Sequence, residues 1–260
     1  MDLGLANRVY IITGGTRGLG FATANALVAE GACVVVVGRT PAQVHHAQDV
    51  LGPSALGICA DLADPMLAER VIERSVASFG RLDGALISVG GPPPGTVLER
   101  SDQDWESAFG SIFLGAIRMA RQLAVYLMSP DQQAQEGVIG VIGMVLSVSA
   151  RQAIPGLSVS NALRPGLAMV ISDLADEVGP YGVRTFGLLP GRIATERIAV
   201  LDEATGDPEA TRARAEAMIP LRRYGTPSEF GEVAAFLLSP RASYITGTCL
   251  AVDGGWMRMP

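Results

Sequence analysis

A glycine-rich segment near the start of the chain has the residue types and spacing of a phosphate-binding turn. Residues 13–20 read TGGTRGLG, directly after the β-branched run 9–13 and before an amphipathic segment. Gly14 permits a tight turn, while Gly18 and Gly20 let the backbone approach a pyrophosphate at the amino terminus of the following helix. Because strand, glycine turn and helix occur in this order, the segment predicts a site for a dinucleotide.

Three polar side chains in the second half of the chain could take part in a reaction. Ser147 ends an apolar run, and Ser160 and Arg164 lie in the segment GLSVSNALRPG, residues 156–166. A serine hydroxyl can orient a substrate by hydrogen bonding, and a guanidinium supplies a fixed positive charge because it effectively never loses its proton. Neither group is a proton donor near neutral pH.

The elements that must position these residues alternate along the chain. Runs of β-branched residues are followed by amphipathic segments, a pattern typical of parallel strands joined by right-handed helical crossovers. We therefore predict an α/β fold with one doubly wound parallel sheet of the Rossmann type, covered by helices on both faces. The predicted strands are 9–13, 33–38, 55–60, 84–88, 137–147, 183–189 and 248–252, and the predicted helices are 18–30, 41–50, 65–79, 102–128, 158–178 and 227–238.

We expect residues 1–260 to form one domain, because no repeat or linker-like stretch interrupts the chain. The charges and weak apolar periodicity of residues 195–217 predict a surface excursion, and we expect this segment to be a mobile lid over the site. Pro165 removes a backbone donor and disfavours helical geometry at Arg164. We therefore expect the helix predicted at 158–178 either to start later or to bend there.

The composition and charge of the chain limit the kinds of partner that can be expected. The net charge is −6 and no basic run occurs, so neither nucleic acid nor an anionic membrane is expected as a partner. The apolar runs are of strand length and the amino terminus lacks a secretory pattern, which predicts a soluble cytoplasmic protein. The histidines, His45 and His46, are adjacent and have no third ligand nearby, so no metal site is predicted. All 20 basic residues are arginine.

The spacing Gly-x-x-x-Gly-x-Gly of the turn resembles that of the short-chain dehydrogenase/reductase family, and the resemblance extends over essentially the whole chain. Further matches are Asp61-Leu62, GPYGVRTFGLLPGRIAT at 179–195, and residues 222–255 near the carboxyl terminus. The resemblance implies a nicotinamide dinucleotide cofactor and a small-molecule substrate. By analogy it also implies a homo-tetramer or homo-dimer, in which the helices predicted at 102–128 and 158–178 pair with their symmetry mates.

The resemblance also assigns cofactor contacts to residues at the ends of the predicted strands and in the loops that follow them. They are Gly14, Thr16, Arg17, Gly18, Leu19, Gly20, Asp61, Leu62, Ser88, Gly90, Arg164, Pro190, Gly191, Ile193 and Thr195.

The choice between the two nicotinamide cofactors can be argued from charge. A carboxylate at the end of the second strand would bind a ribose diol and repel a 2′-phosphate, but Arg39 stands there and Arg17 lies in the glycine turn. Two guanidinium groups near one phosphate favour NADP(H).

The chain departs from the family pattern at the reacting groups. Ser160 and Arg164 stand where the family has tyrosine and lysine, although Ser147 matches the family's active-site serine. After the fourth strand, residues 87–90 read ISVG where the family has Asn-Asn-Ala-Gly. Ile112 stands where a helical asparagine of the family anchors a water.

These departures leave three functions open. The first is an NADP(H)-dependent carbonyl reductase whose proton comes from water, a substrate group or an unusual side chain, with Ser147, Ser160 and Arg164 as the candidate catalytic residues. The second is an imine or iminium reductase, whose substrate arrives already protonated on nitrogen. The third is a catalytically silent NADP(H)-binding protein. The retained cofactor residues argue against the third, and we favour the first.

Overall fold

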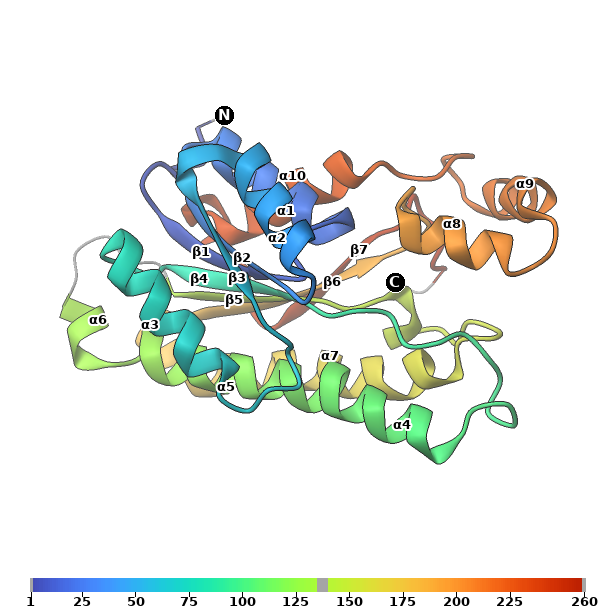
Figure 1. Ribbon diagram of the computed structural model, residues 1–260, viewed down its shortest axis with the longest axis horizontal. Coiled ribbons are helices and arrows are strands. Elements are labelled where there is room, and N and C mark those ends of the chain that lie inside the picture. Colours follow the sequence, from blue (N-terminus) through green and yellow to red (C-terminus); the bar gives the residue numbers. More distant parts are fainter. Residues whose placement is uncertain (1, 135–139, 259–260) are drawn as a thin grey trace.

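The computed structural model describes residues 2–134 and 140–258. In these residues, seven parallel strands form one sheet in the order β3-β2-β1-β4-β5-β6-β7 (Figure 1). The strands are β1 (Val9–Thr13), β2 (Cys33–Gly38), β3 (Ala55–Cys59), β4 (Gly84–Ser88), β5 (Val141–Val145), β6 (Arg184–Pro190) and β7 (Thr248–Val252). The predicted doubly wound sheet is confirmed, while residues 137–139 of the predicted fifth strand lie outside the described residues.

The helices pack against both faces of the sheet. Figure 1 shows α3, α5 and α7 on one face and α1, α2 and α10 on the other. The α-helices are α1 (Gly18–Ala29), α2 (Pro41–Leu51), α3 (Leu67–Phe79), α4 (Asp102–Ala108), α5 (Gly115–Leu127), α6 (Pro130–Ala134), α7 (Ser158–Val178), α8 (Glu196–Glu203), α9 (Pro208–Met218) and α10 (Pro227–Leu238). Short 3₁₀ turns occur at Gly52–Ser54, Val148–Ala150, Gly179–Tyr181 and Pro240–Ala242.

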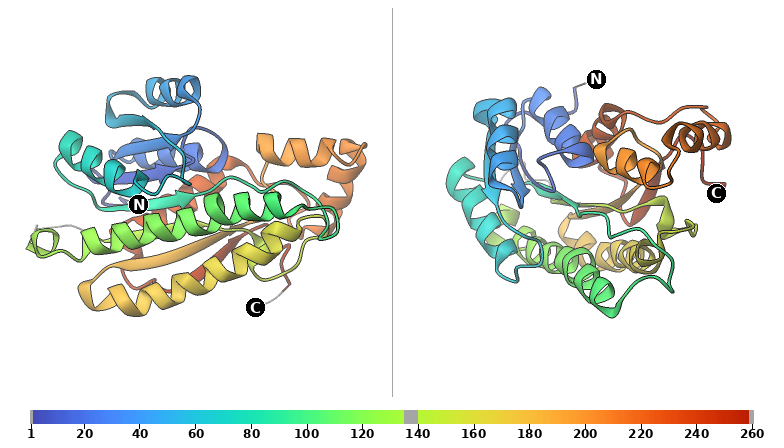
Figure 2. Two further views of the ribbon diagram at one scale, coloured as in Figure 1. Left: turned by 60° about the horizontal axis from the view of Figure 1, so that its bottom comes forward. Right: turned by 45° about the vertical axis from the view of Figure 1, so that its right-hand side comes forward.

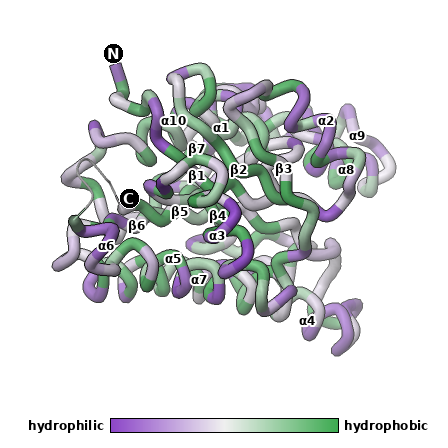
Figure 3. The backbone as a smooth tube through the Cα atoms, turned by 60° about the vertical axis from the view of Figure 1, so that its left-hand side comes forward, coloured by the Kyte–Doolittle hydropathy of each residue, from purple (hydrophilic) through white to green (hydrophobic). Residues whose placement is uncertain are grey.

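The central strands form because their residues are apolar on both faces. All five residues of β1 are buried, and Ile11 pairs in register with Val35 of β2 and Ala85 of β4. Strands covered on both sides by helices must read as continuous apolar runs, which is why the sequence revealed them. Figure 3 shows the hydrophobic colour following these strands through the centre of the molecule.

The helix predicted at 102–128 is not regular along its length. Between α4 and α5 the chain forms a π-helical segment, η2 (Phe109–Leu114). A side chain at Gly166 of α7 would place its Cβ 2.8 Å from the ring of Phe113, so α7 packs closely against this segment. The π-helical turn places Ile112 beside the cavity described below.

The segment 195–217 contains two helices, α8 and α9, that the sequence analysis did not predict. Thr195 and Asp207 each accept a hydrogen bond from a backbone N–H in the first turn that follows, so each helix has a side-chain cap. Asp202 of α8 is buried and accepts hydrogen bonds from Arg192 and Tyr224. Capping and this network stabilise helices whose apolar periodicity is weak. Figure 2 shows them (orange) projecting beyond the sheet.

No helix in the described ranges is both long and apolar enough to cross a membrane.

Asp83 joins the amino-terminal ends of three strands. Its carboxylate accepts hydrogen bonds from the backbone N–H of Val9 (2.9 Å) and from the guanidinium groups of Arg8 (3.0 Å) and Arg81 (2.8 and 2.6 Å). Its backbone pairs with Val9 of β1 and Val141 of β5. The Asp83 side chain is fully buried, so its charge depends on these donors.

We predict that Asp83→Asn lowers the free energy of unfolding by about 3–5 kcal/mol, because it leaves buried donors without their anion. Urea titration followed by circular dichroism measures this change. Asp64→Asn is the matched control, since Asp64 pairs with Arg70 at the surface, and its midpoint should stay nearly unchanged. Equal midpoints for both variants would contradict the role given to Asp83.

Candidate active site

A cavity of about 850 Å³ lies at the carboxyl ends of the strands. It opens where the strand order reverses between β1 and β4, the position at which doubly wound sheets bind ligands. The structure brings every predicted site residue to its lining, namely Gly14, Thr16, Arg17, Gly18, Leu19, Gly20, Arg39, Asp61, Leu62, Ser88, Gly90, Ser147, Ser160, Arg164, Pro190, Gly191, Ile193 and Thr195.

The glycine turn requires glycine at two positions for steric reasons. Gly14 has a φ of +58°, and a Cβ there would lie 2.8 Å from the carbonyl oxygen of Ser88. A Cβ at Gly20 would lie 2.3 Å from the carbonyl oxygen of Gly14. The side chain of Arg17, the residue before α1, makes no capping hydrogen bond, which leaves the first N–H groups of the helix to a ligand. This arrangement fits the pyrophosphate of a dinucleotide.

Two arginines lie at the outer end of the cavity, and each is close to a carboxylate. Arg17 is 3.0 Å from Glu196 of α8, and Arg39 is 4.0 Å from Asp61. All four side chains are largely exposed, so water screens these pairs and neither contact holds its arginine firmly. Both guanidinium groups are therefore free to exchange their partner for a phosphate.

The inner end of the cavity is the part lined by Ser147, Ser160 and Ile112. Arg164 is buried there, with 4% of its surface exposed. Its guanidinium donates to the carbonyl oxygens of Val145 (2.8 Å) and Gly90 (3.3 Å), while its buried Nε has no partner among the described residues. Burial and then the nearby charge of Arg197 lower the pKa of Arg164 to about 10. The side chain therefore stays charged at neutral pH.

Pro165 does not delay the start of α7. The helix begins at Ser158 and continues through Pro165. The side chain of Asn161 forms two hydrogen bonds, each of 2.9 Å, with the backbone of Ile154, so the first turn is held from outside the helix. This contact helps offset the missing N–H of Pro165.

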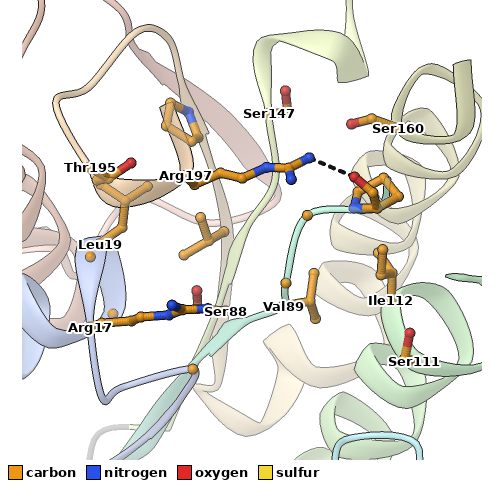
Figure 4. Close-up of a pocket in the computed structure, with 18 of the residues that line it drawn as sticks. Arg17, Leu19, Ser88, Val89, Ser111, Ile112, Ser147, Ser160, Thr195 and Arg197 are labelled. Atoms are coloured by element: carbon orange, nitrogen blue, oxygen red, sulfur yellow. Dashed lines mark hydrogen bonds between the residues drawn. The ribbon is translucent and has the colours of Figure 1, made fainter. Parts of the chain in front are cut away.

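Three serines lie together between β5 and α7. The hydroxyl groups of Ser160 and Ser149 are 2.9 Å apart, and the backbone N–H of Ser149 donates to Oγ of Ser147 at 3.1 Å. Figure 4 shows Ser147 and Ser160 at the same end of the cavity. Sequence reasoning missed Ser149, although its place two residues after Ser147 could have indicated it.

The described lining of the cavity contains no tyrosine, histidine, cysteine or lysine. Ile112 lines the inner end and is 5% exposed, packed among apolar side chains that include Ala108 and Val159. An isoleucine cannot hydrogen-bond a water. The described part of the site therefore offers no side-chain acid with an ordinary pKa between about 6 and 11.

Arg197 of α8 is a pocket residue that sequence reasoning missed. It is half-buried, and its guanidinium donates to the carbonyl oxygen of Pro92 at 2.6 Å, the hydrogen bond dashed in Figure 4. Burial lowers its pKa. The available signal was its position two residues after Thr195, but the charged segment around it favoured a solvated surface.

Comparison with known proteins gives matches along nearly the whole chain. Residues 14–257 match the family model described as enoyl-(acyl carrier protein) reductase. An uncharacterized oxidoreductase of Mycobacterium tuberculosis is 33% identical over 254 residues, which cover 96% of this chain and 92% of the relative.

Two solved structures are similar along nearly their whole length. L-sorbose reductase from Gluconobacter frateurii, in complex with NADPH and L-sorbose, is 29% identical with a TM-score of 0.90 and covers 100% of both chains. The 3-ketoacyl-(acyl-carrier-protein) reductase from Brucella melitensis, in complex with NADH, is 29% identical with a TM-score of 0.86 and covers 97% of this chain and 99% of its own. On this fold, this cavity and the match over residues 14–257, the chain belongs to the short-chain dehydrogenase/reductase family.

Proposed function

We propose that the protein is an NADP(H)-dependent reductase of a small carbonyl compound that takes its proton from water or from the substrate. One observation carries this proposal. Ser147, Ser160 and Arg164 lie together at the inner end of the cavity, whose described lining contains no tyrosine, histidine, cysteine or lysine. This described lining supplies hydrogen-bond donors and a positive charge, but it has no side-chain acid with an ordinary pKa near neutrality.

Each residue can be given a role from its contacts. The cofactor, when bound, supplies the hydride. Ser160, steadied by Ser149, and Ser147 orient the substrate oxygen and stabilise the negative charge that develops on it. Arg164 adds a positive charge that is fixed at neutral pH.

The preference for NADP(H) rests on Arg17 and Arg39. Their present partners, Glu196 and Asp61, are exposed and weakly held, so a 2′-phosphate can displace them. One of the similar structures contains NADPH and another NADH, so the relatives leave the choice to these side chains.

We also propose that residues 1–260 form one domain in which the segment 195–217 acts as a mobile lid. Two contacts of α8 cross the cavity, one between Arg17 and Glu196 and one between Arg197 and the loop after β4. These contacts would hold the lid over a bound substrate.

An imine or iminium substrate is the second candidate. The described lining contains no tyrosine, histidine, cysteine or lysine, and this favours such a substrate, because a substrate already protonated on nitrogen needs only a hydride.

We predict that NADPH binds more tightly than NADH by about tenfold or more, since two charge-assisted contacts to the 2′-phosphate supply at least that ratio. Arg39→Ala should remove much of the difference. Calorimetric titration of both cofactors measures it, with Arg74→Ala, on the outer surface of α3, as the control. Equal affinities in the wild type would refute the proposed preference.

We predict that Ser160→Ala and Ser147→Ala each lower kcat by no more than about 10²- to 10³-fold, the loss typical of one electrostatic donor. Loss of a side chain that donates the proton would lower kcat by a larger factor and would change the pH profile of the rate. With a ketone, the rate should be level through neutral pH and fall as pH rises through about 10, where Arg164 loses its charge.

With an imine, the rate should instead fall as pH rises through the pKa of the substrate nitrogen, and should shift when substitution changes that pKa. Steady-state kinetics across pH, with folding checked by circular dichroism, tests both profiles. One enzyme pKa common to all substrates and absent in Ser160→Ala would disprove this mechanism.

We propose that the chain assembles as a homo-dimer or homo-tetramer through α5 and α7. Val125 of α5 and Met169 of α7 are 60% and 63% exposed although their helices already bury an apolar face. Multi-angle light scattering at micromolar concentration should give a multiple of 27.1 kDa, and Met169→Glu should shift the mass downward. A wild-type monomer would exclude this assembly.

A further inference from the structure

Two arginines at the inner end of the cavity, Arg164 and Arg197, have no carboxylate partner in the part of the chain that the structure describes. Among the described residues, neither Arg164 nor Arg197 has an ion pair, and both donate to backbone carbonyl oxygens instead. The other arginines that line the cavity each have a carboxylate within 4.0 Å, in the pairs Arg17–Glu196, Arg39–Asp61 and Arg192–Asp202. The positive charge of the inner end is therefore uncompensated.

The position of Arg197 is built into the surrounding chain. A Cβ at Gly91 would lie 2.7 Å from Nε of Arg197, so the glycine leaves room for this side chain. Figure 4 shows Arg197 reaching across the cavity, away from Arg17 and Leu19 of the glycine turn and toward the side on which Ser160 lies. Its charge is thus directed to the substrate end of the cavity rather than to the turn that fits the pyrophosphate.

The electrostatic consequence is a site that favours an anion. Burial lowers the pKa of Arg197, and burial together with the charge of Arg197 lowers that of Arg164. Moving a guanidinium group out of water without a counterion costs free energy, and two guanidinium groups close together repel each other. One anionic group between them would offset both costs. The guanidinium of Arg197 has further N–H donors beyond the one given to Pro92, and its planar fork matches a carboxylate.

We infer that the substrate is an oxo acid, whose carboxylate pairs with Arg197 while its carbonyl group lies at Ser147 and Ser160. This inference rests on the proposed reductase function and adds the substrate class to it. In the reaction, the carbonyl carbon gains a hydride as NADPH is oxidised to NADP⁺, and the carbonyl oxygen gains a proton from water, which is released as hydroxide to the solvent. The product is the corresponding hydroxy acid, and the carboxylate is unchanged.

The test compares acids with neutral substrates of the same shape. The probes are 2-oxopentanoate and 4-oxopentanoate, each paired with its methyl ester. For the wild type, kcat/KM for at least one acid should exceed that for its ester by about 10- to 100-fold, the value of one charge-assisted contact. Arg197→Gln should remove this ratio and leave NADPH affinity within about twofold, and Arg197→Lys should retain part of the ratio.

Arg212→Gln is the matched control. Arg212 lies on α9, pairs with Glu216 at 2.8 Å and does not line the cavity, so its loss removes one charge nearby and should leave the ratio unchanged. Equal rates for acid and ester in the wild type would overturn the inference and leave the proposed function standing. A weaker NADPH affinity in Arg197→Gln with an unchanged ratio would also overturn it, because Arg197 would then be a cofactor contact.

Calorimetry separates failure of the inference from failure of the proposed function. If no probe is reduced, 4-oxopentanoate and its ester are titrated into the complex with NADP⁺. Binding of the acid alone, lost in Arg197→Gln and kept in Arg212→Gln, supports the anion site even where the reductase function fails. Equal binding of acid and ester, or binding of neither, overturns the inference.

Discussion

The burial of one guanidinium, which has no carboxylate partner among the described residues, determines how the parts of this site fit together. Arg164 lies in α7, and its two carbonyl partners come from the end of β5 and from the loop after β4. A buried cation without a carboxylate needs these oxygens, because their loss would leave it without solvation. These two hydrogen bonds therefore fix α7 relative to the end of β5 and to the loop after β4. Ser160, which lies one turn earlier on α7, takes its place beside Ser149 as part of the same arrangement.

Membership of the short-chain dehydrogenase/reductase family makes the chain an NAD(P)-dependent oxidoreductase. Within this framework, Ser160 and Arg164 line the inner end of the cavity. A hydroxyl and a guanidinium can hold a substrate and stabilise charge, but neither exchanges a proton near neutral pH. Such a site can act only through the orientation of the substrate and the local electrostatic field, and both depend on the carbonyl acceptors around Arg164.

The sequence was sufficient to predict an element wherever one strong local constraint decides its structure. The strands were predictable because burial on both faces requires continuous apolar runs, and the glycine turn because Gly14 and Gly20 leave no room for a Cβ. Helices α8 and α9 were missed because side-chain caps and the buried Asp202 stabilise them, rather than an apolar stripe. Arg197 was missed for a related reason. Its partner is a backbone carbonyl 105 residues earlier in the chain, and a carbonyl oxygen has no signature in sequence.

The contact between α1 and α10 has a consequence for how the chain is made. These two helices pack together on one face of the sheet, where a Cβ at Gly231 would lie 2.5 Å from the carbonyl oxygen of Ala22. One is near the amino terminus and the other ends at Leu238, so the ribosome delivers them far apart in time. Until α10 emerges, the apolar side chains of α1 and β1 that it covers remain exposed to water. An incomplete chain without α10 is therefore expected to aggregate more readily than the complete fold.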